Sequence, residues 1–310
     1  MALVNLFVAG HPRSGTGTID GWLNAHPDIF MGPKELHYFG SDLDFNVPNR
    51  SKKNYDEQFR QWENQSVIGE SSTWYLASKV AAKEIHGYNP RAKIVLSLRN
   101  PVDWLHSLHS HQVFAGYEDI VEFSAALDAE TERLQGYRLP SNPNPKIAPY
   151  YRSLTNYPAQ IKRYRQCFPE ENILILIFDD LKNEPAQSAD RLFNFLGLNR
   201  DFPNRKSILK GNKKQRNANH KHRSRRLQKW IKSPPRRSIL HGVIPSPVPG
   251  GRLLLRGLHK VNQTDAERRP MTDTLRKKLS EEFKPMIDEL EQLIHVDLSG
   301  WNFHKRKEMI

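Results

Sequence analysis

Short apolar runs alternate with amphipathic segments along most of the chain. Four runs are apolar almost throughout, at residues 3–9, 67–69, 92–98 and 172–178, and we read them as buried strands. Strands that are apolar at every position, rather than at every second one, are typical of a parallel sheet covered on both faces. The pattern therefore predicts a parallel sheet at the centre of the fold.

Segments with helical periodicity lie between and after these strands. We predict helices at residues 17–25, 78–86, 102–115, 157–167, 185–196 and 272–294. In the fifth of these, Leu192, Phe193 and Leu196 share one face, and Gly197 ends the helix. The alternation of strand and helix predicts an α/β fold, a P-loop-type parallel sheet flanked by helices in a single domain over residues 1–310.

Charge is distributed unevenly along the chain. The net charge is +13, and residues 202–264 contain no Asp or Glu but 17 Lys or Arg. Pro and Gly interrupt the pattern there, so we expect a basic insertion or lid at about 203–264. Such a block favours an anionic partner, namely nucleic acid, acidic polysaccharide, lipid head groups or a nucleotide. A solvated insertion without a partner would have the same composition.

Composition also excludes several classes of protein. Cys167 is the only cysteine, which excludes an internal disulfide and a cysteine-based zinc site. The apolar N-terminus has no basic residue before it, and no run approaches the ~18–20 apolar residues of a membrane span, so we expect a cytoplasmic protein. His106, His109 and His111 have no matching acidic residues nearby in sequence, and we expect no metal site.

A Gly-rich turn joins the first predicted strand to the first predicted helix. Amides at such a turn, together with the positive end of the helix dipole, form a binding site for phosphate. The candidate ligand-binding residues are the cation Arg13, the glycines that allow close approach and the hydroxyl donors: Ser14, Gly15, Thr16, Gly17 and Thr18. Thr16 stands where the Walker pattern has lysine, so the usual Mg–ATP site would lack that residue.

A second turn with phosphate-binding character follows the strand at 92–98. That strand ends in Arg99, which suits a phosphate held bidentately, and Ser107 lies about two helical turns further on. Ligands of open α/β sheets bind at the carboxyl ends of strands. Two such turns predict a nucleotide that carries phosphates at both ends.

These turns and four further motifs resemble the 3′-phosphoadenosine 5′-phosphosulfate (PAPS)-dependent sulfotransferases, in particular their bacterial and heparan-sulfate-type branches. The matching segments are residues 12–16, 99–107, 26–39, 69–76, 178–181 and 297–301. The chain departs from the family at two of these positions. Arg13 stands where many members have lysine, and Ser71 stands where some have lysine.

The resemblance implies transfer of a sulfuryl group from PAPS to a hydroxyl or amine, without a required metal. Arg13 and the first turn would neutralise the departing phosphate. Glu35 occupies the position of the general base in the heparan-sulfate-type enzymes, and His37 is the second candidate. The 3′-phosphate would be bound by Arg99, Ser107 and a late basic loop that includes Lys210 and Lys213.

Two other functions stay open at this point. Asp179-Asp180 after a strong strand suits a P-loop kinase or nucleotide triphosphatase, and the basic block suits a non-catalytic polyanion-binding protein. For a sulfotransferase the acceptor would be a glycan, a glycolipid or a small metabolite. We expect partners among acidic glycans or lipids, with peripheral membrane contact through 203–264, and no nucleic acid. The oligomeric state is not predicted.

Overall fold

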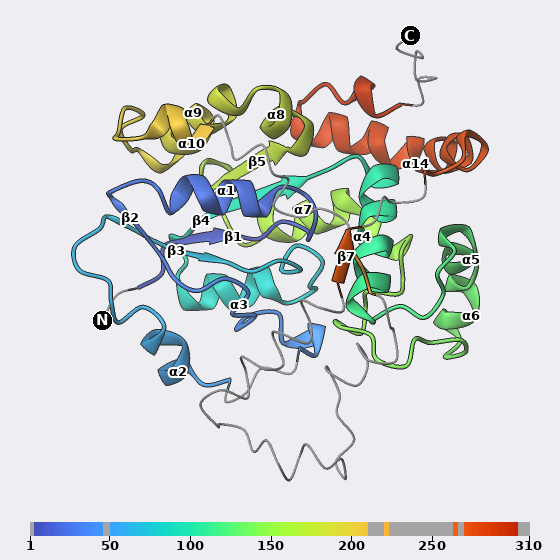
Figure 1. Cartoon of the computed structure of the whole chain (residues 1–310). Coiled ribbons are helices and arrows are strands. Elements are labelled where there is room, and N and C mark those ends of the chain that lie inside the picture. Colours follow the sequence, from blue (N-terminus) through green and yellow to red (C-terminus); the bar gives the residue numbers. More distant parts are fainter. Residues whose placement is uncertain (1–2, 46–49, 210–219, 223–262, 266–269, 303–310) are drawn as a thin grey trace.

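Five parallel strands form the sheet at the centre of the computed structural model (Figure 1). The structure describes residues 3–45, 50–209, 220–222, 263–265 and 270–302. The strands are β1 (Leu6–Val8), β2 (Ile29–Met31), β3 (Val67–Ser71), β4 (Lys93–Leu98) and β5 (Ile173–Ile177), in the order β2-β3-β1-β4-β5. Val8 of β1 pairs with Ser71 of β3 and with Val95 of β4, so the turns after these strands meet at one edge.

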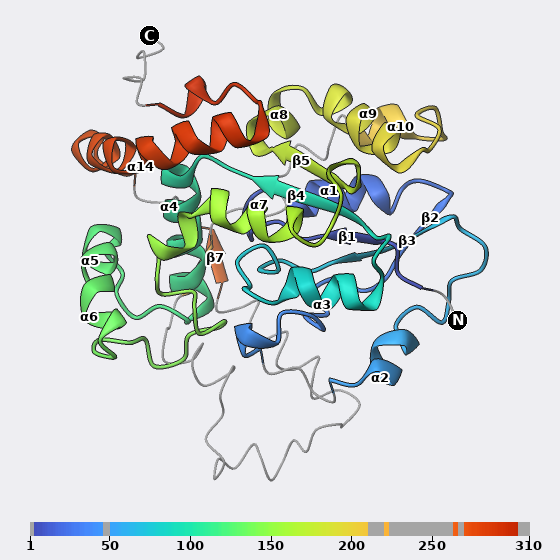
Figure 2. The ribbon, with the colours of Figure 1, turned by 180° about the vertical axis from the view of Figure 1, so that it is seen from behind.

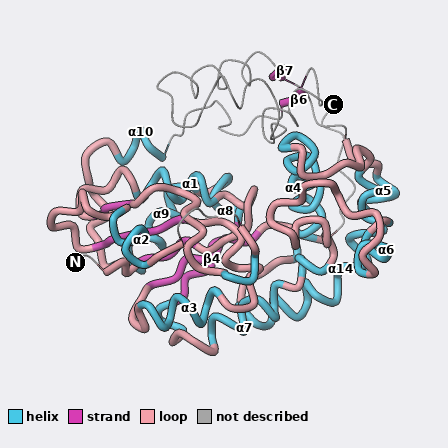
Figure 3. The backbone as a smooth tube through the Cα atoms, turned by 90° about the horizontal axis from the view of Figure 1, so that it is seen from below, coloured by secondary structure: helices cyan, strands magenta, loops and turns pink. Residues whose placement is uncertain are grey.

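Helices cover both faces of the sheet, which is why the strands are apolar throughout. Leu6 and Val8 pack in one core cluster with α1 (Thr16–Leu23) and α9 (Pro185–Leu196). Phe7 points to the other face. That face is covered by α3 (Ala81–Tyr88), α4 (Pro101–Ala115), α7 (Tyr157–Arg165) and α14 (Asp273–Ile294). Figure 2 shows α3 and α7 in front of the strands. In Figure 3 these two helices lie on the opposite side of the sheet from α1 and α9.

The predicted α/β class and its parallel sheet are confirmed, and each predicted strand and helix has a counterpart within a few residues. The prediction did not include β2, which has only three residues between His26-Pro27 and Gly32. It also did not include the short helices α2 (Lys52–Glu57), α5 (Phe123–Asp128), α6 (Glu130–Leu134), α8 (Phe178–Asn183) and α10 (Arg205–Leu209). These helices have five or six residues each, too few to show a helical period.

Most of the basic segment at 203–264 lies outside the described residues, and so do Lys210 and Lys213. Within it the structure describes α10 and the strand β6 (His220–His222), which pairs antiparallel with β7 (Gln263–Asp265). The division into a domain with a basic lid and the predicted membrane contact stay predictions. No helix in the described ranges is long and apolar enough to span a bilayer.

Candidate active site

The turn after β1 has a backbone that only certain residues can adopt. Gly15 lies at φ 93°, and a Cβ there would stand 2.7 Å from Leu181 Cδ1 and 3.1 Å from the Phe178 ring. Gly15 is the N-cap of α1 and offers no side-chain cap, so the first amides of the helix remain available to an anion. A Cβ on Gly17 would meet nothing within 4 Å, so this side of the turn is open among the described residues.

Side chains of the first turn add polar groups to these amides. Ser14 is fully buried, its carbonyl accepts from the Ser97 hydroxyl, and its own Oγ has no hydrogen-bond partner among the described residues. A buried hydroxyl without a partner is costly, and a bound oxyanion would satisfy it. Thr16 is buried as well, whereas Thr18 is exposed on α1. The loop therefore fits a phosphate or phosphosulfate.

The second turn lies directly against the first. Arg99 Nη1 donates to the carbonyl of Arg13 at 2.9 Å, and Arg13 Nε donates to Ser107 Oγ at 3.2 Å. The Arg99 guanidinium also lies 4.4 Å from the centre of the Phe178 ring. Burial lowers the pKa of Arg99, while the carboxylates of Asp103 and Asp179 oppose that shift. Arginine remains charged in proteins, so both cations are present at neutral pH.

Glu35 lies on the loop after β2, at the same edge of the sheet. Its backbone is left-handed at φ 59°, and its amide donates to the carbonyl of Ser71 at 2.9 Å. Its Oε2 accepts from the Thr73 amide at 3.0 Å and from Thr73 Oγ1 at 2.8 Å, and His37 Nε2 lies 3.2 Å from the same oxygen. The two donors of Thr73 therefore fix one carboxylate oxygen and leave the second for other partners.

The electrostatics around Glu35 favour a base with a raised pKa. The carboxyl is 38% exposed, but loss of hydration among the surrounding protein atoms still raises its pKa. The Thr73 hydrogen bonds and the charge of Lys34 oppose this rise, and the charge of Asp20 adds to it. Lys34 Nζ lies 3.8 Å from Asp20 Oδ2, which places the loop after β2 against α1 and the phosphate-binding turn.

His37 lies beside the Glu35 carboxylate as a neutral imidazole. Its ring stacks on Phe45 with centres 3.8 Å apart, and burial together with the charge of Arg50 lowers its pKa to about 4. At neutral pH the imidazole is therefore uncharged. A histidine with this pKa is a weak base, so the geometry favours Glu35 over His37 for proton abstraction.

A buried carboxyl beneath the loops was not predicted from the sequence. Glu70 accepts from the Tyr55 hydroxyl at 2.7 Å and from those of Tyr75 and Ser72 at 2.6 Å. Ser72 Oγ also accepts from the His37 amide at 3.1 Å, so Glu70 anchors the loop that carries Glu35. Thr73 likewise belongs to a recognised motif, but nothing in the sequence indicated its contact with Glu35.

The histidines of α4, which the sequence raises as possible metal ligands, lie apart from this site. His109 is buried, bonds the carbonyl of Ile120 at 2.9 Å and packs on Phe123. No three metal-ligating side chains converge anywhere in the part of the chain that the structure describes.

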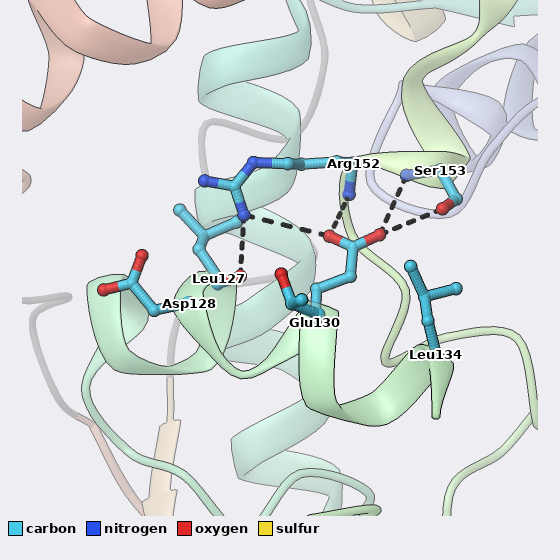
Figure 4. Close-up of a pocket in the computed structure, with 7 residues that line it drawn as sticks. Leu127, Asp128, Glu130, Leu134, Arg152 and Ser153 are labelled. Carbon is cyan, nitrogen blue, oxygen red and sulfur yellow. Dashed lines mark hydrogen bonds and ion pairs between the residues drawn. The ribbon is translucent and has the colours of Figure 1, made fainter. Parts of the chain in front are cut away.

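Figure 4 shows a separate cavity of about 330 Å³ between α5, α6 and the segment at 152–153. Glu130 and Arg152, which line the cavity, form hydrogen bonds with backbone groups of other residues that line it. Glu130 accepts from the amides of Arg152 and Ser153, and Arg152 Nη1 donates to the carbonyl of Leu127. No strand end reaches this cavity. We therefore interpret it as a structural junction and assign it no part in catalysis.

Comparison with known proteins agrees with this geometry. The family model of the sulfotransferase domain matches residues 4–237. The human bifunctional heparan sulfate N-deacetylase/N-sulfotransferase 2 is 26% identical over 200 residues, covering 63% of this chain and 22% of that protein. The membrane-associated sulfotransferase kil1 of Dictyostelium discoideum is 34% identical over 104 residues, covering 33% of this chain and 22% of that protein. The chain thus spans about a fifth of the length of these relatives.

Among solved structures, the sulfotransferase from Alicyclobacillus acidocaldarius matches nearly the whole chain. The TM-score is 0.68 at 26% sequence identity, and the match covers 97% of this chain and 99% of that one. The matched region contains both phosphate-binding turns, Glu35 and the sheet that positions them. The chain therefore belongs to the sulfotransferase family and carries a PAPS-dependent sulfotransferase domain.

Proposed function

We propose that this domain transfers the sulfuryl group of PAPS to a hydroxyl or amine of a glycan, with Glu35 as the general base. The observation that carries the proposal is the Glu35 carboxyl, which has a raised pKa and is fixed by two hydrogen bonds from Thr73 beside an anion-binding turn. The human relative is a heparan sulfate N-deacetylase/N-sulfotransferase and the Dictyostelium relative is a membrane-associated sulfotransferase, which supports sulfuryl transfer and a glycan acceptor.

On the donor side the protein supplies charge and hydrogen bonds rather than protons. PAPS supplies the sulfuryl group, whose bond to the 5′-phosphate breaks as the nucleotide phosphate departs with the electron pair. The amides at the start of α1, the Ser14 hydroxyl and Arg13 would stabilise the charge that develops there. Arg99 and Ser107 would hold the 3′-phosphate, in line with the family resemblance.

On the acceptor side Glu35 takes up a proton. The second carboxylate oxygen would accept it from the attacking hydroxyl or amine while the new bond to sulfur forms. A general base of this kind contributes roughly 10²–10⁴ to the rate. Thr73 keeps the carboxylate oriented, because its amide and its hydroxyl both donate to the oxygen that does not receive the proton.

The donor half of the proposal is tested by calorimetry with 3′,5′-adenosine bisphosphate (PAP), the product nucleotide. We expect wild-type binding in the presence of EDTA and about 10–100-fold weaker binding in Arg13→Ala and in Arg99→Ala, since each removes a charge-assisted contact. Arg191→Ala, at an exposed arginine of α9, is the matched control. Binding that needs Mg²⁺, or that survives both substitutions, would contradict the proposal.

The acceptor half is tested by transfer of radioactive sulfate from PAPS. Heparan sulfate with free amino groups, its fully N-acetylated form and a neutral glycolipid would be offered in parallel. Incorporation into the first two indicates hydroxyl transfer, and incorporation into the first alone indicates amine transfer. Incorporation into neither polysaccharide would reject the glycan assignment while leaving the donor half intact.

A further inference from the structure

The C-terminal 3₁₀ turn η4 (Ser299–Trp301) contacts the second phosphate-binding turn, which follows β4, and also α8, which follows β5. Trp301 is 4% exposed, and its carbonyl accepts from Asn100 Nδ2 at 3.0 Å. Its indole Nε1 donates to Asp179 Oδ2 at 3.1 Å. Figures 1 and 2 show α14, the helix that leads into this turn, beside α8, which carries Asp179.

The two residues that bond to Trp301, Asn100 and Asp179, are next in sequence to Arg99 and to Phe178. Asn100 follows Arg99 in the chain and caps α4, accepting from the Val102 amide at 2.9 Å. Asp179 follows Phe178, whose ring lies under the Arg99 guanidinium. A displacement of Asn100 or Asp179 would therefore move either the cation or the surface on which it rests.

Two carboxylates lie close enough to Arg99 to affect its charge, and the C-terminal segment binds both of them. Asp103 and Asp179 each stabilise the charged form of Arg99. Arg276 of α14 pairs with Asp103 at 2.8 Å, and Trp301 donates to Asp179. Without these partners the carboxylates would compete with a phosphate for Arg99 or repel it.

We propose that Trp301 is a positioning residue for the 3′-phosphate of the donor nucleotide, holding Asn100 in place and Asp179 away from the anion that Arg99 binds. The proposal rests on the donor half of the proposed function. It makes η4 part of nucleotide recognition through its bonds with Asn100 and Asp179. It also assigns Trp301 a specific effect, because only ligands with a 3′-phosphate should respond to its substitution.

The test measures the affinities of PAP and of adenosine 5′-phosphate, which lacks the 3′-phosphate, at low ionic strength. Trp301→Phe keeps an aromatic ring and removes the indole N–H. We expect it to weaken PAP binding about tenfold, equivalent to about 1.4 kcal/mol, and to change adenosine 5′-phosphate binding less than twofold. Trp62→Phe is the matched control, because the Trp62 indole donates to the carbonyl of Gln65 at 2.9 Å near α2.

A second substitution separates positioning from general loss of structure. Adding Asp179→Asn to Trp301→Phe removes the released charge, so PAP affinity should recover to within about threefold of the wild type. Equal losses for the two nucleotides in Trp301→Phe, or no recovery in the double variant, would overturn the proposal. If Trp301→Phe fails to fold, Asp179→Asn alone decides, since the proposal requires PAP affinity to be unchanged or higher and a fall would refute it.

Failure of this inference is distinguishable from failure of the proposed function. The proposed function requires that the wild type bind PAP more tightly than adenosine 5′-phosphate. If it does not, the donor assignment itself is wrong. If it does, and the ratio of the two affinities is the same in Trp301→Phe, only the role of Trp301 is rejected.

Discussion

The donor side of the site, made of Arg13, Arg99 and Ser107, differs from the acceptor side, made of Glu35, His37 and Thr73, in its response to pH. The donor side carries two guanidinium groups, which keep their charge throughout the range in which proteins are folded. The acceptor side carries a carboxyl with a raised pKa and an imidazole with a pKa of about 4. The acceptor side therefore supplies the group that can take up a proton.

This difference matches the two halves of sulfuryl transfer. The departing phosphate is a stable anion that needs charge neutralisation and no proton, and fixed cations provide that. The attacking hydroxyl or amine must lose a proton, and a carboxyl with a raised pKa is a stronger base than an ordinary one. The pH dependence of turnover should therefore arise on the acceptor side.

The largest expected effect separates the two sides directly. Glu35→Gln keeps the size and the hydrogen-bond acceptor of the side chain but removes its basicity, so kcat should fall by roughly 10²–10⁴. The Kd of PAP should change less than twofold, because Glu35 lies on the other side of the site. Glu289→Gln, at an exposed residue of α14, is the control for loss of a carboxylate. A Glu35→Gln enzyme with wild-type kcat would remove Glu35 from the mechanism.

The fold and the donor side were largely predictable from sequence because they depend on local patterns. Apolar runs located four strands, and the turns at Gly15 and Arg99 followed directly from two of them. The sequence does not give the order of strands in the sheet. It therefore could not show that the Arg99 guanidinium contacts the carbonyl of Arg13, 86 residues away in the chain.

The acceptor side was less predictable because its contacts depend on loop geometry. Glu35 was identified by family resemblance, whereas its bonds with Thr73 require a left-handed backbone at residue 35 that no local pattern indicates. In the sequence Glu70 is a polar residue in a predicted strand, and nothing indicates the three hydroxyl groups that donate to it. The contact between Asn100 and Trp301 joins residues 201 apart in sequence, a separation over which patterns give no information.

An intermediate effect is expected from Thr73, which tunes the acceptor side without reacting. The Thr73 hydroxyl donates to the Glu35 carboxylate and so lowers the pKa of Glu35 against the effect of burial. Thr73→Ala should raise that pKa, move the acid limb of the kcat/KM profile to higher pH and slow turnover on that limb by about three- to tenfold. Thr73→Ser keeps the hydroxyl and should restore the wild-type profile. An unshifted acid limb in Thr73→Ala would place the titrating group elsewhere.

The smallest effect concerns His11, a titratable group buried beneath the donor turn. His11 bonds Gln160 Oε1 at 2.7 Å, packs on Trp104 and has a pKa lowered by burial from 6.5 to about 4. Between these values the unfolded chain binds more protons than the native one. The contribution of His11 to the free energy of unfolding is therefore complete above pH 6.5 and is lost as the pH falls toward 4. His37 contributes to stability with the same sign.

His11→Gln should therefore reduce the dependence of stability on pH by up to about 1.4 kcal/mol per pH unit, measured by urea unfolding between pH 4.5 and 6.5. PAP binding near pH 7 should keep its dependence on Arg13 in this variant, because neutral His11 contributes no charge to the donor side. If His11→Gln left the acid loss of stability unchanged, His37 and the carboxyls would account for it. The contrast between the two sides would then rest on Glu35 and His37 alone.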